Sequence, residues 1–260
     1  MINNKKYVRA VSAISLGLLL SFGYLSSSAI AADTHEIKWT YQGESGPQNW
    51  SKLSKEYFSC NNGKNQSPVN IEKTIDGKLP AIPYDYNILV AEQIKNTGHS
   101  IQVDIRSGGT IEVDGKEFKL KQFHFHTPSE NTIKDKSFPL EVHFVHASDD
   151  GKLAVIAMMY TLGASDPLLA NLWRHMPFEK GQSKRLGTKD LSILETDKKL
   201  KQYLRFNGSL TTPPCSEGVI WLVKKPYLHI SLFQLDMLRK AIKHPNNRPV
   251  QATNARMIVD

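Results

Sequence analysis

Two histidines lie two residues apart in the segment 121–130, which reads KQFHFHTPSE. Side chains two apart in a β-strand share a face, so His124 and His126 would project together from one side of a sheet. The next strand-like segment adds His143. Three imidazoles that converge on one point leave the fourth corner of a tetrahedral zinc site open, which is typical of a catalytic site and not of a closed structural one. The sequence therefore predicts a catalytic zinc ion held by these three histidines.

Polar side chains precede two of these histidines by two residues and would share their strand faces. A metal-ligating imidazole usually donates its second N–H to a carboxylate or carbonyl oxygen, which fixes the tautomer. Glu141 is placed to accept from His143, and Gln122 from another ligand. A single histidine here would more often be an ordinary core residue, but three histidines with a nearby carboxylate favour a metal site.

A second metal motif overlaps the first. Residues 124–130 match the His-x-His-x3-Glu half-motif of cupins, in which the glutamate is also a ligand. The other half of that motif requires glycines ahead of the next histidine, and residues 131–143 contain none. We therefore interpret the cupin match as accidental.

Alternating segments predict the strands that carry these side chains. Residues 99–106 would place His99 on an apolar strand face with Ile101 and Val103. Residues 110–120 predict a hairpin that turns at Asp114-Gly115. The second arm would continue with one face made of Phe118, Leu120, Gln122, His124 and His126.

Apolar runs at 140–145, 153–160 and 219–223 predict strands that are covered on both faces. Helical signals are few. Asp166 followed by Pro167 is typical of the start of a short helix, and Ser231 could cap a longer one. We expect a mainly β single domain with a few short helices.

The N-terminal segment has the three parts of a secretory signal, namely a basic start, an apolar middle and small residues at its end. We expect residues 1–31 to be removed on export and residues 32–260 to form the mature domain. A retained membrane anchor is the alternative, but the apolar part is short and interrupted by Ser and Gly. No later segment is long and apolar enough to span a bilayer, so we expect no stable membrane insertion after cleavage.

Charge and cysteine content limit which binding partners and which cellular compartment the sequence supports. The formal charge is +8, part of which lies in the signal, and no basic run is interleaved with aromatic residues, so nucleic-acid binding has no support. The chain has two cysteines, Cys60 and Cys215. In an exported protein an even number of cysteines favours a disulfide, with two buried thiols as the alternative.

Five separate motifs resemble those of α-class carbonic anhydrases, in their bacterial and exported branch. They are SGPQNW (45–50), QSPVNI (66–71), QFHFHTPSE (122–130), LEVHFVH (140–146) and NGSLTTPPCSEGVIW (207–221). The resemblance runs from about Trp39 to the C-terminus. It implies one α-carbonic anhydrase catalytic domain, built on a large, twisted, mostly antiparallel central sheet with a few short peripheral helices.

The resemblance implies zinc-dependent, reversible hydration of carbon dioxide to bicarbonate and a proton, by attack of zinc-bound hydroxide. It implies one Zn²⁺ per chain, ligated by the three histidines. Thr211 would orient the hydroxide, with Glu130 as its carboxylate partner, and His99 would shuttle the proton. Asn246 would supply a backbone carbonyl to a ligand histidine, and Cys60–Cys215 would be the disulfide of exported members. The residues that would line the substrate pocket are Val145, Val155, Leu210, Thr212, Val219 and Trp221.

Several alternatives stay open at this point. By pattern alone His99 is more ordinary as a core histidine than as a proton shuttle. A non-catalytic binding protein on the same scaffold, or a zinc esterase, would be the competing functions. Location would be the periplasm in a Gram-negative cell, and otherwise the medium or the cell surface. The resemblance also implies that a homodimer is common, although no interface is evident from the sequence.

Overall fold

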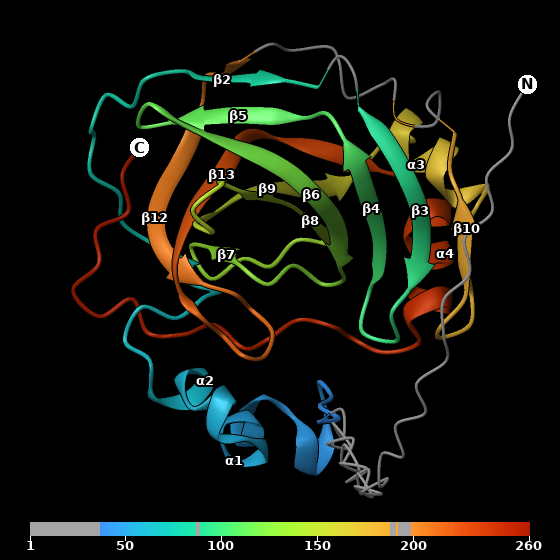
Figure 1. Ribbon diagram of the computed structural model, residues 1–260, viewed down its shortest axis with the longest axis horizontal. Coiled ribbons are helices and arrows are strands. Elements are labelled where there is room, and N and C mark those ends of the chain that lie inside the picture. The colour runs from blue at the N-terminus through green and yellow to red at the C-terminus, as the bar shows by residue number, and fades with distance from the viewer. Residues whose placement is uncertain (1–36, 87–88, 188–190, 192–198) are drawn as a thin grey trace, which may run out of the picture. The chain divides into compact units, whose positions relative to one another are not determined.

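The structure is built on an 11-stranded sheet whose neighbouring strands pair antiparallel throughout, apart from the parallel pair β9 and β13 (Figure 1). It is a computed structural model that describes residues 37–86, 89–187, 191 and 199–260. The predicted signal, residues 1–31, lies outside the described residues. Among the described residues, no helix has the length and apolar character needed to cross a membrane.

The main path of the sheet runs through eight strands. In spatial order they are β10 (Ser183–Arg185), β3 (Val90–Asn96), β4 (Ile101–Ser107), β6 (Lys116–His126), β8 (Leu140–Ala147), β9 (Leu153–Leu162), β13 (Glu217–Ile230) and β12 (Tyr203–Ser209). Three more strands continue from β6, namely β5 (Thr110–Val113), β2 (Ile82–Asp85) and β11 (Lys199–Leu200). A separate parallel pair joins β1 (Asn70–Ile71) to β7 (Thr132–Ile133). The predicted mainly β architecture with a large, mostly antiparallel sheet is confirmed.

The helices are short. Near the N-terminal side lie the 3₁₀ turns η1 (Gly43–Ser45), η2 (Pro47–Asn49) and η3 (Lys55–Tyr57), with α1 (Trp50–Leu53) and α2 (Ser59–Asn62). The other two are α3 (Pro167–Trp173) and α4 (Leu232–Ile242), which pack together. Both predicted caps are present: the Asp166 carboxylate accepts from the Leu169 N–H at 2.9 Å, and Ser231 forms a capping box with Gln234.

The predicted hairpin forms as expected, but the prediction that its second arm keeps one face along its whole length is wrong. Asp114 and Gly115 both have positive φ, as a tight two-residue turn requires. In the pairing of β6 with β8, the register then shifts between Leu120 and Gln122, so Lys121 is an extra residue in β6. A bulge of this kind reverses which residues face each side.

The bulge therefore divides β6 into two parts with opposite alternation. Phe118 and Leu120 lie in the same core cluster as Phe123 and Phe125. The side chains of Gln122, His124 and His126 consequently project from the other face of the sheet.

The apolar strands β8 and β9 are buried on both faces, as predicted. One face contributes to the larger core cluster through residues such as Phe144 and Ile156. The opposite face contributes Val155 and Ala157 to a second cluster, which also includes Trp221. The two faces of the same strands thus have different surroundings.

His146 belongs to the larger core face and is fully buried. Its Nδ1–H donates to the Ala154 carbonyl at 3.3 Å, and its Nε2 accepts from the Tyr86 hydroxyl at 2.7 Å. Both ring nitrogens of a neutral imidazole are therefore satisfied. Burial lowers the pKa of His146 to about 4.

This pKa predicts acid sensitivity of the fold. The unfolded chain protonates His146 near pH 6.5, so its contribution to stability is present above that pH and is lost as the pH falls toward 4. Between pH 7 and pH 4.5 the loss from this residue should be about 2–3 kcal/mol. Urea unfolding at both pH values measures this loss of stability. The double variant Y86F/H146L, which lacks the imidazole and the hydroxyl bonded to it, is the reference. An equal loss of stability in the two proteins would contradict the assignment.

Candidate metal centre

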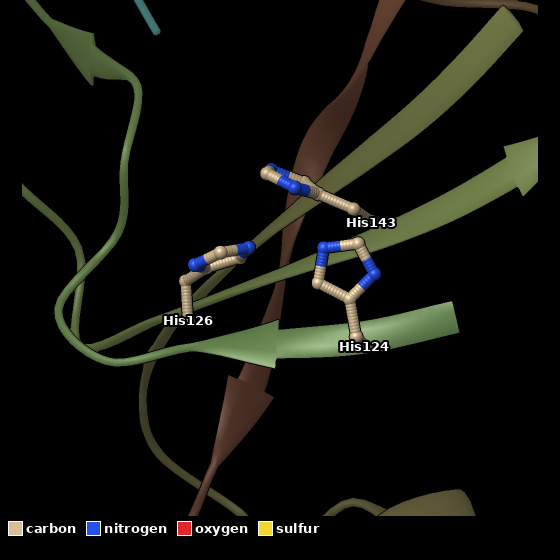
Figure 2. Close-up of side chains that lie close together, drawn as sticks. All are labelled: His124, His126 and His143. Atoms are coloured by element: carbon tan, nitrogen blue, oxygen red, sulfur yellow. The ribbon is translucent and has the colours of Figure 1, made fainter. Parts of the chain in front are cut away.

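The three predicted histidines come together on the sheet face opposite the larger core (Figure 2). His124 and His143 are direct cross-strand partners in the pairing of β6 with β8. The ring centroids lie 4.9 Å apart for His124–His126, 5.3 Å for His124–His143 and 4.6 Å for His126–His143. One nitrogen of each ring lies within 4.8 Å of the others, so a single ion can contact all three.

Each imidazole donates its outer N–H to a fixed oxygen. The Nδ1 of His124 lies 2.8 Å from Gln122 Oε1, and the Nδ1 of His126 lies 2.7 Å from the Asn246 carbonyl. The Nε2 of His143 lies 2.8 Å from Glu141 Oε1. Since these oxygens accept, the proton of each neutral ring is on the outer nitrogen. The lone pairs are therefore on His124 Nε2, His126 Nε2 and His143 Nδ1, which face the common centre.

The chemistry of this donor set fits a zinc ion. Burial, followed by the charge of neighbouring imidazoles, lowers the pKa of His124 and His143 well below the usual value, and burial lowers that of His126. All three rings are thus neutral near pH 7 and can ligate. Within the described part of the chain the buried His126 Nε2 has no hydrogen-bond partner. An orphaned buried nitrogen aimed at two other imidazoles is expected where a metal binds.

Glu141 is the most heavily bonded carboxylate of the site. Its Oε2 accepts from the backbone N–H groups of Glu130 and Asn131 at 2.7 and 2.8 Å. Its Oε1 accepts from the Asn131 amide at 2.7 Å and from His143. The carboxylate cannot rotate without breaking several bonds, so it fixes the orientation of the His143 ring. The sequence did not single out Asn131 as a partner of Glu141.

Glu130 lies close to the point that the imidazoles face. Its Oε1 accepts from the Arg248 N–H at 2.9 Å, and its Oε2 is 3.5 Å from His126 Nε2 and 3.9 Å from His143 Nδ1. Oε2 makes no hydrogen bond of standard geometry with the described residues. Burial raises the pKa of Glu130 to about 8, while hydrogen bonds from Arg248 and from the Thr211 hydroxyl oppose that rise.

An apolar wall adjoins the histidines. The Trp221 ring packs edge-on to His143, with centroids 4.9 Å apart. Five of the six residues predicted to bind substrate belong to the second core cluster, which includes Trp221, or pack against it. They are Val145, Val155, Leu210, Val219 and Trp221. Thr212 is half-buried in the loop after β12, where its carbonyl accepts from the Cys215 N–H at 2.9 Å.

Asn246 contributes more than the predicted backbone carbonyl. Its side-chain amide donates to the carbonyl oxygens of His99 and Phe125 at 2.9 and 2.8 Å, and its Oδ1 accepts from the Thr127 N–H at 2.9 Å. This one residue therefore joins the end of β6 to the turn that carries His99. Such a contact across the chain has no local sequence signal.

His99 lies in a turn and not on a strand face, contrary to the prediction from alternation. Gly98 has a φ of +82°, and the Thr97 hydroxyl accepts from the N–H groups of His99 and Ser100 at 3.2 and 2.9 Å. Strand β4 begins only at Ile101. The His99 ring is half-buried and stacks on Trp39, with centroids 3.7 Å apart and planes 10° apart.

The predicted disulfide is present between Cys60 and Cys215. Both cysteines are buried in a small cluster with Tyr41 and Trp50. The bond joins α2 to the loop after β12 that contains Thr211. Arg248, which the sequence does not single out, is buried nearby: its Nη1 donates to the Ser67 carbonyl at 2.6 Å, and its Nη2 donates to the Cys60 carbonyl.

Three neutral imidazoles on one face of a large, mostly antiparallel sheet, with an adjoining carboxylate and apolar wall, are the features expected of an enzyme that binds a single metal ion and leaves one ligand position open. The family model of eukaryotic-type carbonic anhydrases matches residues 45–260. The chain belongs to this family of enzymes, which interconvert carbon dioxide and bicarbonate.

Similar proteins agree with that membership over nearly the whole chain. The carbonic anhydrase of Neisseria gonorrhoeae is 44% identical, covering 98% of this chain and 99% of that protein. The carbonic anhydrase of Klebsiella pneumoniae is 43% identical, covering 91% and 96%. The solved structure of the α-carbonic anhydrase of Thermovibrio ammonificans, in complex with the inhibitor sulfanilamide, is 42% identical. Its TM-score is 0.80, with 86% of this chain and 100% of that chain covered.

The bonding of Glu141 predicts how metal affinity responds to its substitution. Glu141→Gln removes one acceptor from the set that holds His143 and both backbone N–H groups, so the ring should lose its fixed orientation. The affinity for Zn²⁺ should fall about 10–100-fold. Competition with a chelator of known affinity measures it, and Glu112→Gln, an exposed carboxylate on the hairpin, is the matched control. Unchanged affinity in the Glu141 variant would show that this carboxylate does not support the metal.

Proposed function

We propose that the chain hydrates carbon dioxide reversibly at one zinc ion held by His124, His126 and His143. The observation that carries the proposal is the convergence of three neutral imidazoles, one of which has a buried and otherwise unpartnered nitrogen. When bound, Zn²⁺ lowers the pKa of a water molecule to about 7, a value established for carbonic anhydrases themselves. It thereby supplies hydroxide near neutral pH.

Thr211 and Glu130 orient the nucleophile in this proposal. The ionised Glu130 carboxylate would accept the hydrogen of the Thr211 hydroxyl, and the positive charge of a bound zinc ion would favour that ionised form. The hydroxyl oxygen of Thr211 can then only accept a hydrogen bond, so it selects a nucleophile that has a proton to donate and turns a lone pair toward the substrate. The backbone N–H of Arg248 donates to Glu130 Oε1 and keeps this carboxylate in place.

Carbon dioxide binds against the apolar wall formed by Val145, Val155, Leu210, Val219 and Trp221. An uncharged and weakly polar molecule gains little from hydrogen-bond donors, but it can replace water against such a wall. The wall packs on His143, so a molecule held there lies beside the metal. Thr212 contributes the polar edge of the pocket, where the product anion leaves.

His99 transfers the proton that hydration releases. An imidazole titrates near neutral pH and can both accept and release a proton. The ring lies in a turn, half-buried and stacked on Trp39, so it can exchange protons with solvent. The Asn246 amide holds the turn close to the end of β6.

We further propose that the mature chain begins after residue 31 and acts outside the cytoplasm, in the periplasm of a Gram-negative cell or otherwise secreted. The disulfide supports this location, since such bonds persist in oxidising compartments. A non-catalytic binding role is disfavoured because the three histidines, Thr211 and Glu130 are all in place. An esterase role has no pocket feature in its favour.

Replacement of His143 by Ala tests the ligand assignment. The variant should lose carbon dioxide hydration in stopped-flow assays and bind less Zn²⁺, because two imidazoles cannot hold the ion as three do. The parent protein treated with a chelator should lose the same activity and regain it on addition of zinc. His229→Ala, a change at an exposed histidine near the end of β13, is the control. Undiminished turnover in the His143 variant would refute the assignment.

Replacement of His99 by Ala tests the proton pathway separately from the metal. Turnover in weak buffer should fall by about tenfold or more, while zinc content stays unchanged. Added imidazole should restore the rate, since it replaces the missing base. If the variant turns over at the parent rate in weak buffer, another group carries the proton.

A further inference from the structure

A cavity of about 570 Å³ lies on the face of β8 and β9 that is opposite the three histidines. Its floor includes Phe144 and Ile156, which pair with each other across the two strands. The adjacent cross-strand pair is His143 with Ala157, and successive residues of a strand point to opposite faces. The cavity and the candidate metal centre therefore share two strands but open on different sides of the sheet.

The interior of this cavity is apolar and aromatic. Tyr86 donates its hydroxyl hydrogen to His146, and the Asp166 carboxylate lies close to the Tyr160 hydroxyl. Asp166 accepts from the first turn of α3. Because these polar atoms contact one another, the interior presents mainly aromatic rings and aliphatic side chains to any ligand. Its remaining apolar lining includes Leu168, Leu200 and Leu228.

Four lysines line the same cavity, from two different segments. Lys199 and Lys201 belong to β11 and the residue that follows it, and Lys224 and Lys225 belong to β13. Lys225 pairs with Asp260 at 2.6 Å. Within the described part of the chain, Lys199, Lys201 and Lys224 form no ion pair. Lysine side chains keep their ammonium groups at the water boundary, so positive charge gathers where the apolar interior meets solvent.

We propose that this cavity is a second binding site, for an amphipathic organic anion. The apolar body of the ligand fills the interior, and its carboxylate lies among Lys199, Lys201 and Lys224. The volume is within the range of about 300–1,000 Å³ that is typical of small-molecule pockets. An apolar interior with a cationic mouth selects against both polar anions and apolar cations. The site does not depend on the metal centre or on the proposed mechanism.

Titration calorimetry with dodecanoate, below the concentration at which it forms micelles, tests the proposal on the full mature protein. We expect one dodecanoate per chain. The triple variant K199Q/K201Q/K224Q should bind about tenfold more weakly, since each exposed pair contributes a modest amount. The control variant K55Q/K136Q/K240Q, which changes three exposed lysines outside the cavity, should bind as the parent does. Equal affinity in the two triple variants would overturn the assignment of the carboxylate.

Leu228→Trp tests the interior, because a larger side chain on the lining occupies the cavity. The variant should lose dodecanoate binding while its rate of carbon dioxide hydration stays unchanged, which also shows that it folds. If it fails to fold, Met158→Trp on the same lining replaces it. If a folded variant whose cavity is filled by the new Trp still binds dodecanoate, the proposal is overturned.

Two further arms distinguish this cavity from the metal centre and test its preference for anions. Dodecanoate should bind equally to the zinc-loaded and the chelator-treated protein, and a loss of binding on chelation would place the ligand at the histidines and overturn the proposal. Dodecyltrimethylammonium has the same chain with a cationic head and should bind at least several-fold more weakly. Equal binding of the cation would show that the lysines do not select the ligand, which also contradicts it.

Discussion

Three imidazoles must each keep a lone pair on the nitrogen that faces their common centre, and the rest of the site follows from this constraint. Protonation of an imidazole in this site would place a positive charge in a desolvated environment, and this desolvation lowers the pKa of His124 and His143. The single proton of each ring must then be directed outward. Gln122, the Asn246 carbonyl and Glu141 do this through bonds of 2.7–2.8 Å. Removing an outer acceptor frees the ring to turn and to change tautomer, so the acceptors matter as much as the imidazoles.

The scaffold meets the constraint through register. Antiparallel pairing places His124 opposite His143 and His126 opposite Glu141, which fixes the relative position of two ligands before any side-chain packing is considered. The bulge at Lys121 determines which face they occupy. Without the extra residue, the alternation that buries Phe118 and Leu120 would also direct the histidines into the larger core. The first part of β6 buries apolar side chains in the larger core, and its last part presents histidines on the opposite face. A one-residue bulge, which interrupts the two-residue alternation, makes both possible in one strand.

The sequence predicts the parts of this arrangement that depend on local pattern. Alternation, the Asp114-Gly115 turn and the caps at Asp166 and Ser231 are set by neighbouring residues, and each forms as expected. The bulge is not local in this sense, since it depends on pairing with β8. Alternation with Ile101 and Val103 predicts that His99 lies on a strand, but the side chain of Thr97 closes a turn there instead. The contacts of Asn246 and Arg248 join segments more than 100 residues apart, and no spacing rule reveals them.

His146 shows why burial alone does not identify a ligand. It lies three residues after His143 in β8, is equally buried and also has a lowered pKa. Both nitrogens of His146 are satisfied, by Tyr86 and by the Ala154 carbonyl. Among the described residues, His143 forms a hydrogen bond only through Nε2, and its Nδ1 lies 3.9 Å from Glu130 Oε2, beyond hydrogen-bond distance. His126 Nε2 is buried and also has no hydrogen-bond partner among the described residues, and such an atom is costly unless something else binds it. The unpaired nitrogen, and not the buried ring, therefore separates the candidate ligand from the core histidine on the same strand.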